Sequence, residues 1–142
     1  MGIKTEFILY GDNFPVHELA DELKLQKISI ETKGQIRHIG PNAIESRIAD
    51  CTSLLYETEY IDPIDVGVSL DVAYTALAPH VNQIKEYINK YHLTAKFVVV
   101  INLSENPIIS IPAKFIHLAN ELCAEIQFDS YIKQNKKMFW RR

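Results

Sequence analysis

Two aspartates and one arginine are the residues that the sequence best places for chemistry. Asp12 and Asp129 each follow or end an expected strand, where a carboxylate can act as an acid or base if burial raises its pKa. Arg37 offers a cation for an anionic ligand. We therefore take Asp12, Arg37 and Asp129 as candidate ligand-binding residues that would meet at one end of a sheet. The alternative, that such an aspartate accepts hydrogen bonds from a turn backbone, stays open.

Other chemistry-bearing side chains are dispersed. Between residues 31 and 49 stand four cationic or imidazole groups, which indicate either an anion site or a solvated loop: Lys33, Arg37, His38 and Arg47. His17 and His117 take similar places in two short repeats, as ligands of a metal between adjacent helices or as helix-surface residues.

Recognisable catalytic motifs are missing from the sequence. It has no Gly-rich phosphate loop, no His-Glu-x-x-His, no Cys-x-x-Cys and no Gly-x-Ser-x-Gly. The sequence therefore predicts no catalytic residues, no metal site and no cofactor, and it favours a protein that is not an enzyme.

Composition and charge narrow the class of protein. The chain has 142 residues, 47% hydrophobic and 23% charged, as in one soluble globular domain. A net charge of -3 gives no general attraction to nucleic acid or to anionic membrane, so we expect neither partner. Cys51 and Cys123 have no ligand-spaced companion and are expected to be buried free thiols in the cytoplasm. No secretory signal or apolar span is present.

The charge is unevenly distributed along the chain. After Ile132 come five basic residues and no acidic one: Lys133, Lys136, Lys137, Arg141 and Arg142. We expect a single domain over residues 1–132 and a basic tail over residues 133–142. The aromatic residues of this tail would suit phosphates, bases or a membrane surface, whereas a packed or frayed terminus is the simpler alternative.

The element that organises the chain is the run Phe97-Val98-Val99-Val100-Ile101. Five consecutive β-branched and aromatic residues predict a strand covered on both faces. Further strands are expected over residues 5–10, 25–30, 51–60 and 125–131, and helices after Pro15 and after Pro112. A long amphipathic helix over residues 70–91 should kink or divide at Pro79. Residues 31–49 read as a long irregular loop.

A short internal repeat suggests the architecture. Residues 19–23 and 118–122 agree at four of five positions, and each copy lies between two expected strands. Two β-α-β units predict an α+β fold, a ferredoxin-like or related sandwich with a mainly antiparallel sheet and an additional long kinked helix. The first strands of the two units, residues 5–10 and 97–101, should meet in the middle of the sheet.

The order of several segments resembles a known family. These segments are residues 5–12 with Phe14-Pro15, Lys33-Gly34, Leu77-Ala78-Pro79, and residues 118–122 leading to Asp129-Ser130-Tyr131. Together they are similar to the small bacterial proteins of domain of unknown function 4279. The resemblance implies a compact bacterial α+β domain and no established activity, so it transfers no site residues.

Two hypotheses of function follow. The first and favoured one is a non-catalytic interaction module, for example one that sequesters a protein partner as an immunity protein does. The alternative is an enzyme or small-ligand-binding protein with a site at the sheet end that carries Asp12, Arg37 and Asp129. Because the run 97–101 is apolar on both faces, we expect either the helix over residues 70–91 or a second copy, in a homodimer through the sheet face, to cover the second face.

Overall fold

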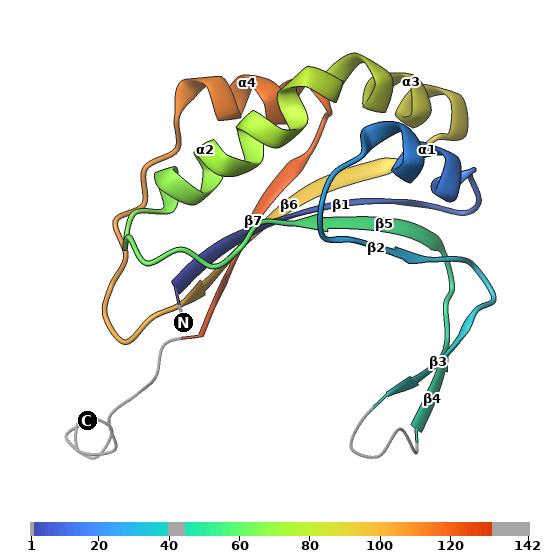
Figure 1. Ribbon diagram of the computed structural model, residues 1–142, viewed down its shortest axis with the longest axis horizontal. Coiled ribbons are helices and arrows are strands. Elements are labelled where there is room, and N and C mark those ends of the chain that lie inside the picture. Colours follow the sequence, from blue (N-terminus) through green and yellow to red (C-terminus); the bar gives the residue numbers. More distant parts are fainter. Residues whose placement is uncertain (1, 40–44, 132–142) are drawn as a thin grey trace.

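The computed structural model describes residues 2–39 and 45–131 of the chain (Figure 1). The strands are β1 (Gly2–Gly11), β2 (Ile28–Glu31), β3 (Ile36–Ile39), β4 (Glu45–Ile48), β5 (Thr52–Glu57), β6 (Thr94–Asn102) and β7 (Glu125–Ser130). The helices are α1 (Val16–Leu23), α2 (Val66–Leu77), the 3₁₀ turn η2 (Ala78–His80), α3 (Val81–Tyr91) and α4 (Ala113–Glu121). The predicted α+β class is confirmed.

The main sheet has the order β2-β5-β1-β6-β7. Its first four strands are antiparallel to their neighbours, whereas β7 lies parallel to β6. Because α1 joins β1 to β2 across β5, and α2–α3 joins β5 to β6 across β1, these elements form the split β-α-β arrangement of ferredoxin-like folds. The long kinked helix thus belongs to this core, and α4 with β7 is the addition. The sequence predicts the opposite, with the long helix as the addition and α4 with β7 in the core. Both expected β-α-β segments nevertheless form.

All the described helices lie on one face of the sheet (Figure 1). Leu70, Leu77 and Ile84 of α2 and α3 share one core with Phe7 of β1 and Phe115 of α4. The expectation that the long helix covers the second face is therefore wrong. Its division at the proline is confirmed, because η2 interrupts the helix where Pro79 has no backbone N–H to donate.

The face away from the helices is called the outer face below; it carries Lys4, Glu6, Ile8, Leu55, Glu57, Val98 and Val100. Val98 and Val100 are only 9% and 6% exposed, although no described helix lies over them. Their register neighbours on β1 and β7 are long or polar: Glu6, Gln127, Lys4 and Asp129. Side chains of this kind shield a valine between them with their stems. A strand that is apolar on both faces thus needs no second layer.

A hairpin replaces the irregular loop expected over residues 31–49. β3 pairs with β4 in an antiparallel ladder that leaves the main sheet on the side away from the helices (Figure 1). The chain turns at Gly34, whose φ of 88° is the left-handed value that a type II turn needs, and Gln35 N–H donates to the carbonyl of Thr32 at 3.0 Å. The turn residues before β3, rather than an apolar periodicity, therefore determine where the hairpin begins.

Two further expectations concern the cysteines and the basic tail. The thiols of Cys51 and Cys123 are free, but Cys51 is only partly buried and Cys123 is exposed. Cys123 sits in the turn after α4 with a φ of 51°, where the chain reverses toward β7 and its side chain faces solvent. The predicted basic tail over residues 133–142 lies outside the described residues.

Candidate functional site

Asp12 lies in the turn that follows β1. Its side chain is 82% exposed and forms an ion pair with the ammonium group of Lys33. The hydrogen bond from Lys33 to Asp12, together with the charge of Asp12, raises the pKa of the lysine. Lys33 also donates its backbone N–H to Thr52 Oγ1 at 3.0 Å. The carboxylate therefore ties the β1 turn to the base of the hairpin and is not a buried acid or base.

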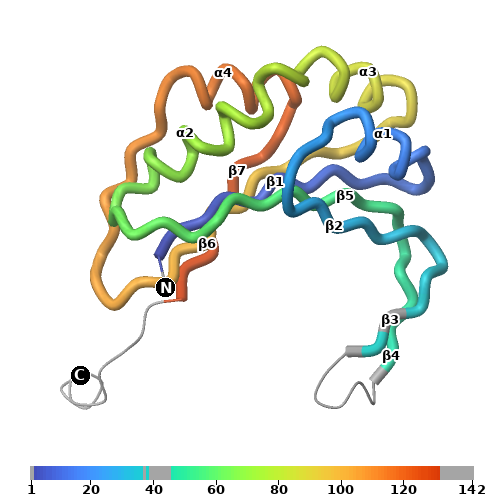
Figure 2. The backbone as a smooth tube through the Cα atoms, in the orientation of Figure 1, coloured from blue at the N-terminus to red at the C-terminus, as the bar shows by residue number. Residues whose placement is uncertain are grey.

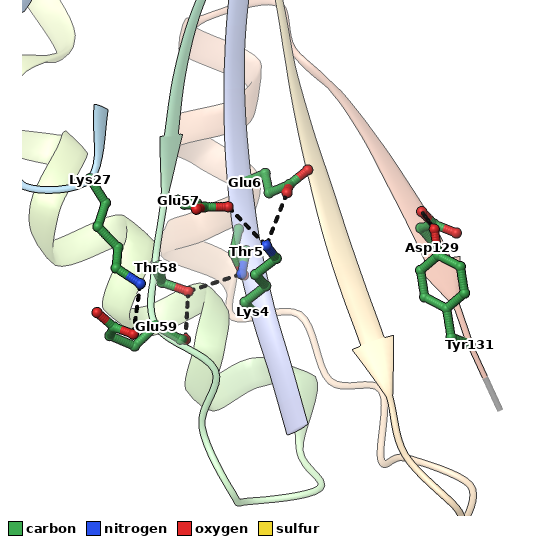
Figure 3. Close-up of polar contacts among 9 residues, drawn as sticks. All are labelled: Lys4, Thr5, Glu6, Lys27, Glu57, Thr58, Glu59, Asp129 and Tyr131. Atoms are coloured by element: carbon green, nitrogen blue, oxygen red, sulfur yellow. Dashed lines mark hydrogen bonds and ion pairs between the residues drawn. The ribbon is translucent and has the colours of Figure 1, made fainter. Parts of the chain in front are cut away.

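Asp129 lies near the end of β7 on the outer face. The Tyr131 hydroxyl donates a hydrogen bond to its Oδ2 at 2.9 Å, and this bond with the carboxylate charge raises the pKa of Tyr131. Figure 3 shows the two side chains together on β7, apart from the polar groups of β1 and β5. Asp129 is exposed and has a local partner of its own.

The strand register separates the two aspartates. Asp129 pairs with Val100, and Val100 pairs with Lys4 near the beginning of β1. Asp12 follows the other end of β1, eight residues after Lys4, which corresponds to about 26 Å at 3.3 Å per residue. The expected common site of Asp12, Arg37 and Asp129 at one end of the sheet is therefore not formed, because antiparallel pairing of β1 and β6 sends the two strand ends in opposite directions.

The backbone of Arg37 is part of β3 and pairs with Arg47 on β4. The side chain of Arg37 lies outside the described part of the structure. Arg47 Nη2 lies 3.1 Å from both carboxylate oxygens of Glu31. Of the four predicted cationic groups of this segment, Lys33 and Arg47 thus have acidic partners within the chain. An anion site built on them would need to break these ion pairs.

The histidines do not meet in a cluster. His17 lies on α1, and His117 Nε2 lies 3.7 Å from Glu121 of its own helix, α4. Among the described residues, no group of three or more His, Cys, Asp and Glu side chains is arranged to hold a metal ion.

A cluster of ion pairs occupies the outer face instead (Figure 3). Lys4 Nζ lies 2.8 Å from Glu57 Oε2 and 3.4 Å from Glu6 Oε2, and 5.1 Å from the ring centre of Tyr60. Partial burial opposes the charged amine, but the hydrogen bond and charge of Glu57, helped by Glu6, raise the net pKa of Lys4. One lysine offsets only one of the two carboxylates, so the cluster of Lys4, Glu6 and Glu57 keeps a net charge of -1.

The hairpin exposes two isoleucines that sequence reasoning missed. Ile36 of β3 and Ile48 of β4 lie directly opposite each other and are 61% and 66% exposed. Cross-strand partners of this kind have Cβ atoms about 5 Å apart, so the two side chains form one apolar projection. The sequence gives no clear signal for this pair, because Ile36 stands between Gln35 and Arg37 and no apolar alternation surrounds it.

A hollow of about 250 Å³ lies on the outer face beside the base of the hairpin. It is lined by Glu6, Ile8, Ser29, Ile30, Glu31, Ser53 and Leu55. Figure 2 shows that β2 continues into β3 and that β4 continues into β5. Residues of β2 and β5 line the hollow, so the hollow lies next to the strands that carry Ile36 and Ile48. The candidate functional site is this combination of hollow and projection, and it is suited to binding a protein surface.

Comparisons with known proteins place the chain in one family. No curated protein and no solved structure matches it. In the described residues, no helix combines the length and apolar character that crossing a membrane requires. A family model covers residues 1–133, nearly the whole chain and all the elements described above. The chain therefore belongs to the family described as Domain of unknown function (DUF4279).

Proposed function

We propose that this protein acts by binding another protein chain, without catalysis, through the hairpin β3–β4 and the adjoining outer face. The observation that carries the proposal is the exposure of Ile36 and Ile48, 61% and 66%, on an element that projects from the body. Scattered exposed apolar residues are ordinary, but two that face each other at the base of a projecting ladder, next to an apolar hollow, form a contact surface. An interaction module of the kind expected from the sequence needs such a surface.

The occupant that we propose is a second copy of the chain. One molecule carries both an apolar projection, Ile36 with Ile48, and an apolar hollow with Ile8 and Leu55 on its floor. In a twofold dimer each copy would place its projection in the hollow of the other, so that one patch serves both sides. Among protein partners, a second copy is the one whose surface this structure describes.

The charges of the outer face are compatible with this pairing. Lys4 pairs with Glu57 and Glu6 and leaves one carboxylate charge unbalanced, so two such faces can approach each other at a modest electrostatic cost that salt reduces. The unpaired thiols of Cys51 and Cys123 support a cytoplasmic location, because the cytoplasm keeps thiols reduced.

Sedimentation over a concentration series tests the proposal. The wild-type chain should form a dimer within the micromolar range, and a variant with Ile36→Ser and Ile48→Ser should remain a monomer with an unchanged melting temperature. The matched control replaces two exposed isoleucines outside the surface, Ile108 and Ile109, which are 56% and 58% exposed, with serine. This control should dimerise as the wild type does.

Three outcomes would contradict the proposal. A wild-type chain that stays monomeric at high micromolar concentration rules out the second copy. Dimers that persist in the Ile36 and Ile48 variant but not in the control place the contact elsewhere. Conversion of a metabolite that Asp12→Asn or Asp129→Asn abolishes would favour the enzyme hypothesis over the binding one.

A further inference from the structure

A second, larger cavity lies on the helix side of the sheet, away from the hairpin. Its volume is about 390 Å³, within the range of small-molecule sites. It lies between the connection from α1 to β2, the end of β5 and one side of α2. The residues that line it are Lys24, Leu25, Gln26, Lys27, Tyr56, Glu57, Thr58, Glu59, Ile61, Val72 and Ala76.

The cavity exists because β2 begins late. Its first residue, Ile28, pairs with Tyr56, so β2 does not extend alongside Thr58 and Glu59. The chain that precedes β2 instead runs through two non-glycine residues in the left-handed conformation, Lys24 with a φ of 51° and Lys27 with a φ of 57°. Such residues carry a conformational cost and are concentrated around binding sites.

Tyr56 sets this cavity apart from an ordinary surface groove. The side chain is only 7% exposed, yet no residue of the structure lies in hydrogen-bonding geometry to its hydroxyl. The other buried hydroxyls of the described chain are all bonded. Thr5 Oγ1 lies 2.8 Å from Ser69 Oγ, Thr58 Oγ1 accepts from the Thr5 N–H, and Thr52 Oγ1 accepts from the Lys33 N–H.

The hydroxyl has no partner among the described residues and is open to the cavity, so a bound ligand must supply the acceptor that water would otherwise provide. Burial raises the pKa of the Tyr56 phenol, so the hydroxyl keeps its proton and can donate it to an acceptor. The hydroxyl oxygen is not fully enclosed by protein. A ligand in the cavity could therefore supply the missing acceptor.

The lining carries two cationic residues, Lys24 and Lys27, and two acidic ones, Glu57 and Glu59, so its net charge is zero. Lys27 Nζ pairs with Glu59 Oε2 at 2.7 Å at the edge of the cavity, as Figure 3 shows, and Glu57 is held by Lys4 at 2.8 Å. Apolar side chains supply much of the remaining lining: Leu25, Ile61, Val72 and Ala76. A charged ligand would gain little here and would lose its hydration, so the lining favours a neutral one.

We propose that this cavity binds a small neutral molecule with a mainly apolar body and one carbonyl or ether oxygen, which accepts the hydrogen bond of the Tyr56 hydroxyl. The cavity and the hollow on the outer face share no lining residue.

A pair of fluorescent probes tests the site. One is the neutral ketone 6-propionyl-2-(dimethylamino)naphthalene, and the other is 2-(dimethylamino)naphthalene, which lacks the carbonyl. The wild-type protein should bind the ketone with a shift of its emission to shorter wavelength. Tyr56→Phe removes only the hydroxyl and should weaken ketone binding about fivefold, while binding of the analogue without the carbonyl stays unchanged.

Two further variants complete the test. Ala76→Leu places a larger side chain in the cavity and should abolish binding of both probes. Tyr87→Phe is the matched control, because the Tyr87 hydroxyl already donates to Glu22 at 3.3 Å and lies outside the cavity. A wild-type protein that binds neither probe, or a ketone affinity that Tyr56→Phe leaves unchanged, would overturn the proposal. A Tyr87→Phe variant as weak as Tyr56→Phe would do the same.

Discussion

Phe7 and Phe97 lie directly opposite each other at the centre of the sheet, with their ring centres 5.0 Å apart. Each is the aromatic residue of the first strand in one of the two β-α-β segments recognised in the sequence. Phe115 of α4 adds a third ring, 4.7 Å from that of Phe97. The contact between the first strands of the two segments, predicted from the sequence, is thus an aromatic cluster in the core.

The aromatic pair should be energetically coupled. In a double-mutant cycle with Phe7→Leu and Phe97→Leu, we expect a coupling of about 1 kcal/mol in the free energy of unfolding, because the pair contributes beyond its buried area. Urea unfolding of the four proteins gives the value. A parallel cycle with Phe7→Leu and Phe115→Leu should give a smaller coupling, since those two rings do not touch and are linked only through Phe97. Equal coupling in both cycles would contradict a specific ring contact.

Val99 should not tolerate a charge. Its side chain is fully buried on the helix side of β6, so Val99→Asp would leave a carboxylate unpaired in the core and should prevent folding. Circular dichroism and thermal melting measure the loss. Thr94→Asp, at an exposed position of the same strand, is the control and should melt near the wild-type temperature. A wild-type melting temperature for Val99→Asp would refute the assignment of β6.

Asp65 should make stability depend on pH in acid. It accepts hydrogen bonds from the Ser110 hydroxyl at 2.7 Å and from the Gly67 N–H at 2.8 Å, and these bonds lower its pKa below the ordinary value of 3.8. A depressed pKa in the folded state stabilises the protein above pH 3.8, and this contribution is lost as pH falls through the folded value.

Asp65→Asn isolates this effect, because asparagine keeps the acceptor oxygen at the beginning of α2 but does not titrate. The urea midpoint of the wild type should fall more between pH 5 and pH 3 than that of the variant. Identical pH dependence of the two proteins would show that the carboxylate charge contributes nothing.

The two thiols should react at different rates. Burial, reinforced by the charge of Asp50, raises the pKa of Cys51, whereas Cys123 is exposed. Since the thiolate is the reactive form, iodoacetamide at pH 8 should modify Cys123 first. Mass spectrometry of the intact protein follows the reaction, and Cys123→Ser should retain only the slow phase. A single fast phase in that variant would be evidence against the protected environment of Cys51.

Much of the fold can be read from the sequence because its signals are local and strong. The apolar run around Val99 predicts a strand, and Pro79 predicts the division between α2 and α3. The strand expected over residues 51–60 forms as β5, whose buried residues are Thr52, Leu54 and Tyr56. The side of the sheet on which the long helix packs depends on connections across the whole chain. It cannot be read from the local periodicity of the helix.

The candidate site was less accessible to sequence reasoning. Whether Asp12 and Asp129 meet depends on strand direction and register, which emerge only when β1, β6 and β7 pair. The hairpin strands have four residues each, too few for alternation to stand out. Tyr56 reads in the sequence as an ordinary core residue, and only the geometry around its hydroxyl distinguishes it.

The pairing of β1 with β6 has a consequence for how the protein is made. Phe7 and Phe97 are about 90 residues apart, so β1 must wait until β6 has been synthesised before it gains its second neighbour. Until then it can pair only with β5, and its other edge presents unpaired backbone N–H and C=O groups to strands of other chains. Long-range closure of this kind slows folding. Synthesis of this chain therefore includes an interval in which an unfinished sheet is exposed to aggregation and to the chaperones that prevent it.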